Sequence, residues 1–238
     1  MTSGAPPQEY YNRKNKVCLI HNDISKKSYI KAAYDILREE GADALTIRKV
    51  ADRLHCNSAN LYRYFSNLEE LTLYASLKYL DAYIRQVVEL SHSGKPILEQ
   101  HLDVWSTFAS HAFCHPQIYN NLFFGKYSDM LSSVIADYYE LFPEETLNMN
   151  MDYIPVFLKE GDFFRRDYMM LEKCIQAGLF TETEAVLINK MSIYICKGCM
   201  KTLLDHPEKD PELIKADFLE CVKAILMTYA NISRPPYE

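Results

Sequence analysis

The apolar and polar positions of residues 46–71 predict two short helices around a tight turn, with a further helix behind them. The first helix has one apolar stripe, at the i, i+3, i+4 and i+7 positions: Ile47, Val50, Ala51 and Leu54. Residues 55–57 break this pattern, and the second helix then turns Leu61 and Phe65 inward. Its other faces carry polar, aromatic and basic side chains, which suit a DNA groove.

Helices are also predicted on both sides of this pair. Residues 25–40 have an amphipathic pattern that ends at Gly41, a residue that readily adopts the geometry of a helix end. On the other side, Ser66 and Glu69 have the spacing of a capping box, and an apolar stripe follows them. We therefore expect one continuous helix over residues 66–90, about 20 residues of which already span about 30 Å.

The rest of the chain follows the same helical period, and prolines stand at the apparent segment ends. Helices are predicted near residues 97–113, 116–124, 126–141, 153–177, 182–205 and 210–231. Two of their starts are well marked, because Thr181 and Glu184 form a capping box and Asp210 precedes a first-turn proline. The expected fold class is all-α.

The charge of the chain is distributed unevenly. Its formal net charge is -6, but residues 1–65 contain 11 Lys or Arg against 7 Asp or Glu, and the remainder contains 15 against 25. A basic module supplies the phosphate-neutralising charge that dominates affinity for DNA. The basic front of the chain therefore agrees with the DNA groove proposed for the helix pair.

Residues 1–24 show no helical period and carry a basic cluster at Arg13, Lys14 and Lys16. Two readings remain open, a solvated tail and an arm that lies along DNA. Seven cysteines are scattered along the chain, the first residues lack the apolar core of a signal peptide, and no apolar run is long enough to span a bilayer. We expect a reduced, cytoplasmic protein without membrane contact.

The stretch GADALTIRKVADRLHCNSANLYRYFSNLEEL resembles the DNA-binding region of the tetracycline-repressor (TetR) family, and the resemblance covers about forty residues from Ile30 to Leu71. It implies an N-terminal three-helix helix-turn-helix domain. Two positions depart from the family. His55 stands where glycine is usual, and we expect the turn to persist because histidine tolerates its backbone geometry better than most residues. Leu68 stands where a lysine is usual, so one phosphate contact is missing.

The resemblance also assigns roles to residues. In helix-turn-helix proteins the second helix enters the major groove with its first residues at the base edges. The expected base-reading residues are Ser58, Ala59, Asn60 and Arg63. The expected phosphate contacts are Thr46, Arg48, Tyr62 and Tyr64, with core packing as the alternative for Tyr62.

The last two predicted helices are apolar on more than one face, which indicates a partner. The TetR resemblance implies a homodimer through residues 182–231 that binds palindromic double-stranded DNA; plain core packing is the alternative. The expected division of the chain is a basic tail at 1–24, the helix-turn-helix domain at 25–70, and a helical effector-binding and dimerisation domain at 71–238. The expected function is a ligand-responsive transcriptional regulator, a repressor rather than an activator.

An aromatic-rich middle region is the place where the resemblance implies a small-molecule effector, since such pockets are apolar with a few polar groups. The candidate residues are His101, Trp105, Phe108, Tyr127, Phe157, Glu160, Phe164 and Tyr168. For each of them, ordinary core packing is an equal alternative. A second domain that binds a protein instead of a small molecule is also open.

The sequence offers little catalytic or metal-binding chemistry. His111, Cys114 and His115 are close in sequence, as are Cys196 and Cys199, but neither group has a second half that would complete a four-ligand zinc site. There is no glycine-rich phosphate loop, nucleophile elbow or HExxH motif. We expect no cofactor, no metal and no catalytic residue, and an all-α enzyme is the weakest alternative.

Overall fold

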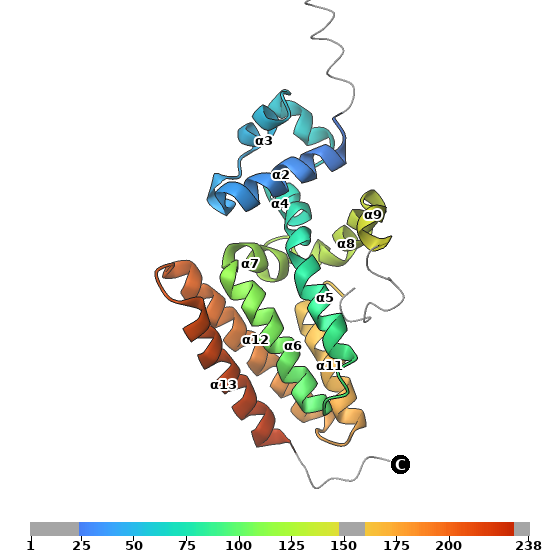
Figure 1. The fold of residues 1–238 in the computed structure, drawn as a ribbon, viewed down its shortest axis with the longest axis vertical. Coiled ribbons are helices and arrows are strands. Elements are labelled where there is room, and N and C mark those ends of the chain that lie inside the picture. The colour runs from blue at the N-terminus through green and yellow to red at the C-terminus, as the bar shows by residue number, and fades with distance from the viewer. Residues whose placement is uncertain (1–23, 148–159, 231–238) are drawn as a thin grey trace, which may run out of the picture. The chain divides into compact units, whose positions relative to one another are not determined.

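The computed structural model describes residues 24–147 and 160–230, which form helices and turns with no β-strand among them (Figure 1). The all-α prediction is confirmed. The chain divides into two compact domains, Met1–Ala75 and Ser76–Glu238. Within the described residues, none of the helices combines the length and the apolar character needed to cross a membrane.

The first domain contains α2 (Lys26–Glu40), the 3-10 helix η1 (Ala42–Ala44), α3 (Ile47–Arg53), the 3-10 helix η2 (Ser58–Arg63) and most of α4 (Leu68–Ser76). Its core consists of apolar residues at helical spacing: Tyr29, Ile30, Ala33, Ile36, Val50, Ala51, Leu61, Phe65 and Leu71. Each large side chain buried in this way contributes about 1.5–3 kcal/mol. The helix-turn-helix pair is therefore held by burial along α2 and α4.

Side chains that accept hydrogen bonds from free backbone N–H groups set the starts of these helices. Ser25 and Ser28 form a capping box at the start of α2. Thr46 Oγ1 accepts from the Lys49 N–H at 3.1 Å and caps α3.

The predicted capping box at Ser66 and Glu69 is wrong by one residue. Asn67 Oδ1 accepts from the Glu70 N–H at 2.9 Å, and Glu70 Oε2 accepts from the Ser66 N–H at 2.7 Å. Asn67 and Glu70 have the same three-residue spacing as the predicted pair, so the pattern alone does not distinguish the two registers. The helix begins at Leu68.

The continuous helix predicted for residues 66–90 is interrupted. α4 ends at Ser76, the 3-10 turn η3 (Leu77–Tyr79) follows, and α5 runs over Leu80–Ser91. The Tyr119 hydroxyl donates to the carbonyl of Tyr79 at 3.1 Å, a side-chain contact of the kind that disturbs a helical hydrogen-bond ladder. The apolar stripe continues through the interruption, so periodicity does not reveal it.

The second domain continues with α6 (Ile97–Cys114), α7 (Pro116–Phe124), η4 (Ser128–Met130), α8 (Leu131–Leu141), α9 (Pro143–Leu147), α11 (Phe163–Gln176), α12 (Glu182–Asp205) and α13 (Pro211–Tyr229). α6 packs against α5, α11, α12 and α13, and the long helices α12 and α13 lie side by side (Figure 1). The predicted caps at Thr181 and Asp210 are confirmed.

Two predicted helix starts in this domain are wrong, and one short helix was not predicted. The helix predicted from residue 126 begins at Leu131, after η4, and the short helix α9 was not predicted. The helix predicted from residue 153 begins at Phe163, where Asp162 Oδ1 accepts from the Arg165 N–H at 2.7 Å. Residues 153–159 of that prediction lie outside the described residues.

Candidate nucleic-acid interface

The turn between α3 and η2 depends on one residue in the left-handed region of backbone conformation. His55 has a φ of +52° and is the one non-glycine residue with positive φ in the described part of the chain. Its N–H donates to the Asp52 carbonyl, and the Cys56 N–H donates to the Ala51 carbonyl at 3.0 Å. The prediction that the turn persists with histidine is confirmed.

The recognition element is the 3-10 helix η2. Asn57 Oδ1 accepts from the Ala59 N–H at 2.9 Å and fixes its start, and the fully buried Leu61 anchors it to the core. A 3-10 helix has three residues per turn, so residues three apart share a face. Asn60 and Arg63 therefore lie on one face of η2, which brings two expected base-reading side chains together.

All the predicted DNA-binding residues lie at the surface of the first domain: Thr46, Arg48, Ser58, Ala59, Asn60, Tyr62, Arg63 and Tyr64. Asn60 is partly exposed, and the other seven are exposed. Tyr62 is 58% exposed, so the alternative that placed it in the core is wrong. The assignment of bases and phosphates to these side chains stays a prediction.

Tyr64 has a structural contact that the sequence did not indicate. Its hydroxyl donates to the Ile24 carbonyl at 3.0 Å, and its ring lies 5.7 Å from the ring of Tyr29. Tyr64 thus ties the segment before α2 to the end of η2. Its hydroxyl must leave the Ile24 carbonyl if it is to donate to a phosphate.

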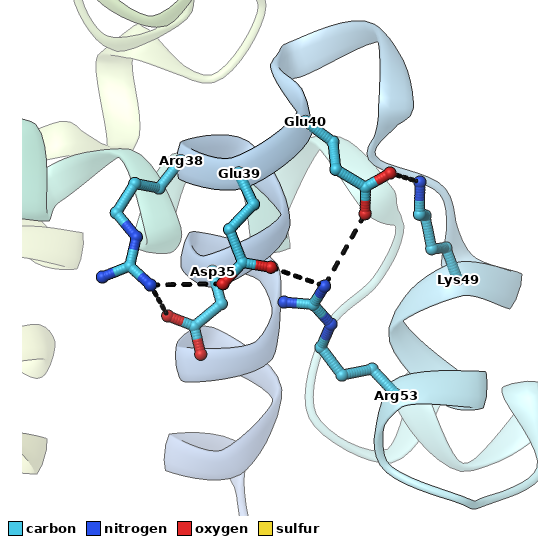
Figure 2. A network of polar contacts seen from close by, with 6 residues as sticks. All are labelled: Asp35, Arg38, Glu39, Glu40, Lys49 and Arg53. Atoms are coloured by element: carbon cyan, nitrogen blue, oxygen red, sulfur yellow. Dashed lines mark hydrogen bonds and ion pairs between the residues drawn. The ribbon is translucent and has the colours of Figure 1, made fainter.

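Two cations of α3 are paired with carboxylates of α2 (Figure 2). Lys49 Nζ contacts Glu40, and Arg53 contacts Glu39 at 2.8 Å and Glu40 at 3.6 Å. Arg38 contacts Glu39 from the other side at 3.2 Å. Hydrogen bonds from Arg53 and Arg38 lower the pKa of Glu39, which keeps this carboxylate ionised. The spacing of the sequence does not reveal that Glu40 is the partner of Lys49.

The remaining cations of the helix pair are more accessible. The Arg48 side chain is 91% exposed and lies 3.8 Å from Asp52, an exposed i, i+4 pair of the kind that stabilises little. Arg63 is exposed, and no ion pair to it occurs within the residues that the structure describes. Arg48 and Arg63 are thus the two arginines best placed to meet DNA.

A compact three-helix core that presents a short polar helix behind a tight turn defines a helix-turn-helix DNA-binding domain. The family model for bacterial regulatory proteins of the tetR family matches residues 30–75. The chain is thus similar to this family over these residues of its N-terminal domain. It is also 44% identical over 41 residues to the uncharacterised HTH-type transcriptional regulator YdeS of Bacillus subtilis. That match covers 17% of this chain and 21% of YdeS, so the chain spans about a fifth of this curated relative.

Solved structures share the fold over most of the chain. FadR of Thermus thermophilus, a TetR-family repressor in complex with lauroyl-CoA, is 13% identical with a TM-score of 0.57 and covers 90% of this chain and 99% of its own. A TetR variant of Acinetobacter baumannii in complex with minocycline is 15% identical with a TM-score of 0.51, covering 87% and 96%. A transcriptional regulator of Rhodococcus sp. is 14% identical with a TM-score of 0.52, covering 88% and 100%. At these identities the likeness shows the fold.

Phe163 lines two cavities of the second domain. A small one of about 20 Å³ has room for roughly one water molecule and includes Trp105, Phe108, Arg166 and Asp167 in its wall. A larger one of about 520 Å³ has the size of a ligand site. Its wall consists of Phe123, Phe124, Ser128, Asp129, Ser132, Glu160, Gly161, Asp162, Phe163, Phe164 and Lys197.

The predicted effector residues are only partly brought together. Glu160 and Phe164 line the larger cavity, and Trp105 and Phe108 line the small one. Three further candidates do not line either cavity: His101, which is buried, and Tyr127 and Tyr168, which are partly exposed. The candidate Phe157 lies outside the described residues.

The sequence did not predict a buried polar cluster that lies beside the small cavity. Asp167 Oδ2 accepts from Asn189 Nδ2 at 2.9 Å, and His101 Nε2 lies 3.6 Å from Asp167 Oδ1. Burial raises the pKa of Asp167 to about 7 despite the hydrogen bond from Asn189, and burial lowers the pKa of His101 to about 4. One sequence signal existed, because Arg166 and Asp167 occupy the stripe of α11 that also carries the buried Met170 and Leu171.

The histidine and cysteine groups do not form a metal centre in the described residues, where no three His, Cys, Asp or Glu side chains gather. His111 lies 3.2 Å from Gln86 Oε1, and the His115 ring packs edge-on against Tyr79. Burial raises the pKa of the Cys199 thiol to about 11, which disfavours the reactive thiolate.

Proposed function

We propose that the protein is a ligand-responsive repressor that binds palindromic DNA as a homodimer, with η2 in the major groove. The observation that carries this proposal is the exposed face of η2, where Asn60 and Arg63 share one side and Arg63 has no ion-pair partner among the described residues. Asparagine suits adenine and arginine suits guanine in bidentate pairs. Arg48 then contacts the phosphate backbone and sets the register.

The surfaces of α12 and α13 support the homodimer. Among the described residues, five of the eight exposed large apolar side chains lie on these two helices: Val186, Leu187, Tyr194, Leu213 and Met227. Tyr194 is 62% and Leu213 66% exposed. Exposed apolar surface on two adjacent helices marks a protein interface. A second copy of the chain fits it, because a twofold dimer presents two recognition helices to a palindrome.

The effector site we propose is the larger cavity of the second domain. Its wall combines phenylalanine rings with a few charged groups, the composition of a small-molecule site. Two proteins with the same fold have been solved with lauroyl-CoA and with minocycline. An effector changes the affinity of the protein for DNA only if it binds one conformation of the protein more tightly than another. A true effector should raise the melting temperature of the protein and lower its affinity for operator DNA.

The decisive experiment starts with selection of an operator from a random duplex library by the full-length protein. The variants Asn60→Ala and Arg63→Ala should each weaken binding to that operator about 10- to 100-fold at fixed salt, because each bidentate base contact contributes about 1–3 kcal/mol. Arg85→Ala removes an exposed arginine from α5 and is the matched control, which should bind as the wild type does. Unchanged operator affinity in both η2 variants would refute the proposed function.

A further inference from the structure

Ion pairs between α2 and α3 engage part of the positive charge of the helix pair. Residues 46–65 contain four cations, Arg48, Lys49, Arg53 and Arg63. Figure 2 shows two of these, Lys49 and Arg53, directed toward the carboxylates at the end of α2. Two of the four are therefore engaged with carboxylates of α2, and Arg48 has only the exposed Asp52 of its own helix at 3.8 Å.

Each of the two cations contacts at least one carboxylate, and Arg53 contacts two. Glu40 uses one oxygen for Lys49 and the other for Arg53 at 3.6 Å, and Glu39 binds Arg53 at 2.8 Å. All four side chains are between 32% and 46% exposed, so they lie at the surface and not in the core. A phosphate that approached Lys49 or Arg53 would compete with a carboxylate that is already in contact.

We propose that Glu39 and Glu40 set the balance between specific and sequence-independent DNA binding by holding Lys49 and Arg53 away from phosphates. Phosphate neutralisation supplies essentially all of non-specific binding, whereas base contacts supply discrimination. Masking two cations lowers the contribution of phosphate neutralisation and leaves the base contacts of η2 intact. The inference rests on the DNA binding of this domain, and it does not depend on which operator is recognised.

Binding to a duplex of about 25 base pairs without operator sequence tests this proposal, with full-length protein and fluorescence anisotropy as the readout. The double variant Glu39→Gln/Glu40→Gln frees two cations, each of which adds about 0.9 to the steepness of log K against log salt. Its affinity should then fall about tenfold more than that of the wild type between roughly 50 and 200 mM salt. At the lower salt concentration it should bind this duplex about tenfold more tightly.

The control Glu69→Gln removes one exposed carboxylate from α4 of the same domain, and Glu40→Gln is its single-charge counterpart. Only Glu40→Gln should steepen the salt dependence. In a chain that also carries Lys49→Gln and Arg53→Gln, the two glutamate changes should have no effect on the salt slope, which separates unmasking from a general change in net charge.

A salt slope of the double variant equal to that of the wild type, with a melting temperature that shows it folded, would overturn the proposal. So would equal effects of Glu40→Gln and Glu69→Gln, because the two glutamates would then only tie α2 to α3. Loss of all duplex binding in the double variant would overturn it as well. Failure of the wild type to select an operator would instead refute the proposed function and leave the salt slopes measurable on the non-operator duplex.

Discussion

The two domains distribute charged and apolar side chains in opposite ways. In the first domain the ionisable groups lie at the surface in pairs such as Arg53 and Glu39, and its exposed large apolar residues, within the described range, are tyrosines. The second domain buries Asp167 and His101 and exposes aliphatic side chains on α12 and α13. Buried ionisable groups and exposed apolar faces both cost free energy. The second domain therefore departs from the usual arrangement at the surface where we propose a second copy of the chain, and also in the polar cluster beside the small cavity.

The largest expected effect concerns the exposed aliphatic face. Leu187→Glu combined with Leu213→Glu places two carboxylates on the proposed dimer surface, where each would be buried without a partner. We expect light scattering to report the mass of one chain instead of two. Operator affinity should fall at least tenfold, because each head then binds its half-site alone.

Met130→Glu is the control for this prediction. Met130 is similarly exposed at 42% but lies on η4, which is not part of the proposed dimer surface on α12 and α13. This variant should keep the mass and the operator affinity of the wild type. If the Leu187→Glu/Leu213→Glu variant remained dimeric, the exposed aliphatic face of α12 and α13 would have a role other than dimerisation. The proposed link between exposed apolar side chains and a second copy of the chain would then be wrong.

A smaller effect is expected from the buried carboxyl. The pKa of Asp167 is about 7 in the folded protein, against an ordinary value of 3.8. At a pH between these two values the folded protein keeps the proton on Asp167, whereas the unfolded protein has released it. Its contribution to stability therefore declines as the pH rises from about 4 to 7. Asp167→Asn cannot ionise, and its free energy of unfolding relative to the wild type should rise by about 1–3 kcal/mol between pH 5 and pH 7.

Urea unfolding followed by the fluorescence of Trp105 measures this directly, since Trp105 is the single tryptophan of the chain and belongs to the second domain. Glu140→Gln removes an exposed carboxylate from α8 and should show no such dependence on pH. A difference between Asp167→Asn and wild type that stays constant across this range would mean that the carboxyl is ionised in the folded protein at both pH values.

The same contrast explains what the sequence could predict. The recognition site of the first domain is one contiguous motif, so its helices, its turn at His55 and its exposed residues follow from local spacing. The polar cluster of the second domain joins Asp167, Asn189 and His101, which come from three different helices and meet only through tertiary packing. The ion pairs of Lys49 and Arg53 with α2 escaped prediction for the same reason, since helical periodicity says nothing about partners on another helix.

The smallest expected effect tests how far the turn of the first domain is dictated by local geometry. With φ at +52°, His55 occupies a conformation that costs most side chains about 1–2 kcal/mol, and glycine almost nothing. His55→Gly should stabilise the first domain by about 0.5–1 kcal/mol, and His55→Val should destabilise it by about 1 kcal/mol or more. Hydrogen exchange of the α3 amides in the full-length protein gives both values. Equal protection in the wild type and the His55→Val variant would show that the turn tolerates a negative φ at residue 55. The claim that local backbone geometry dictates this turn would then be wrong.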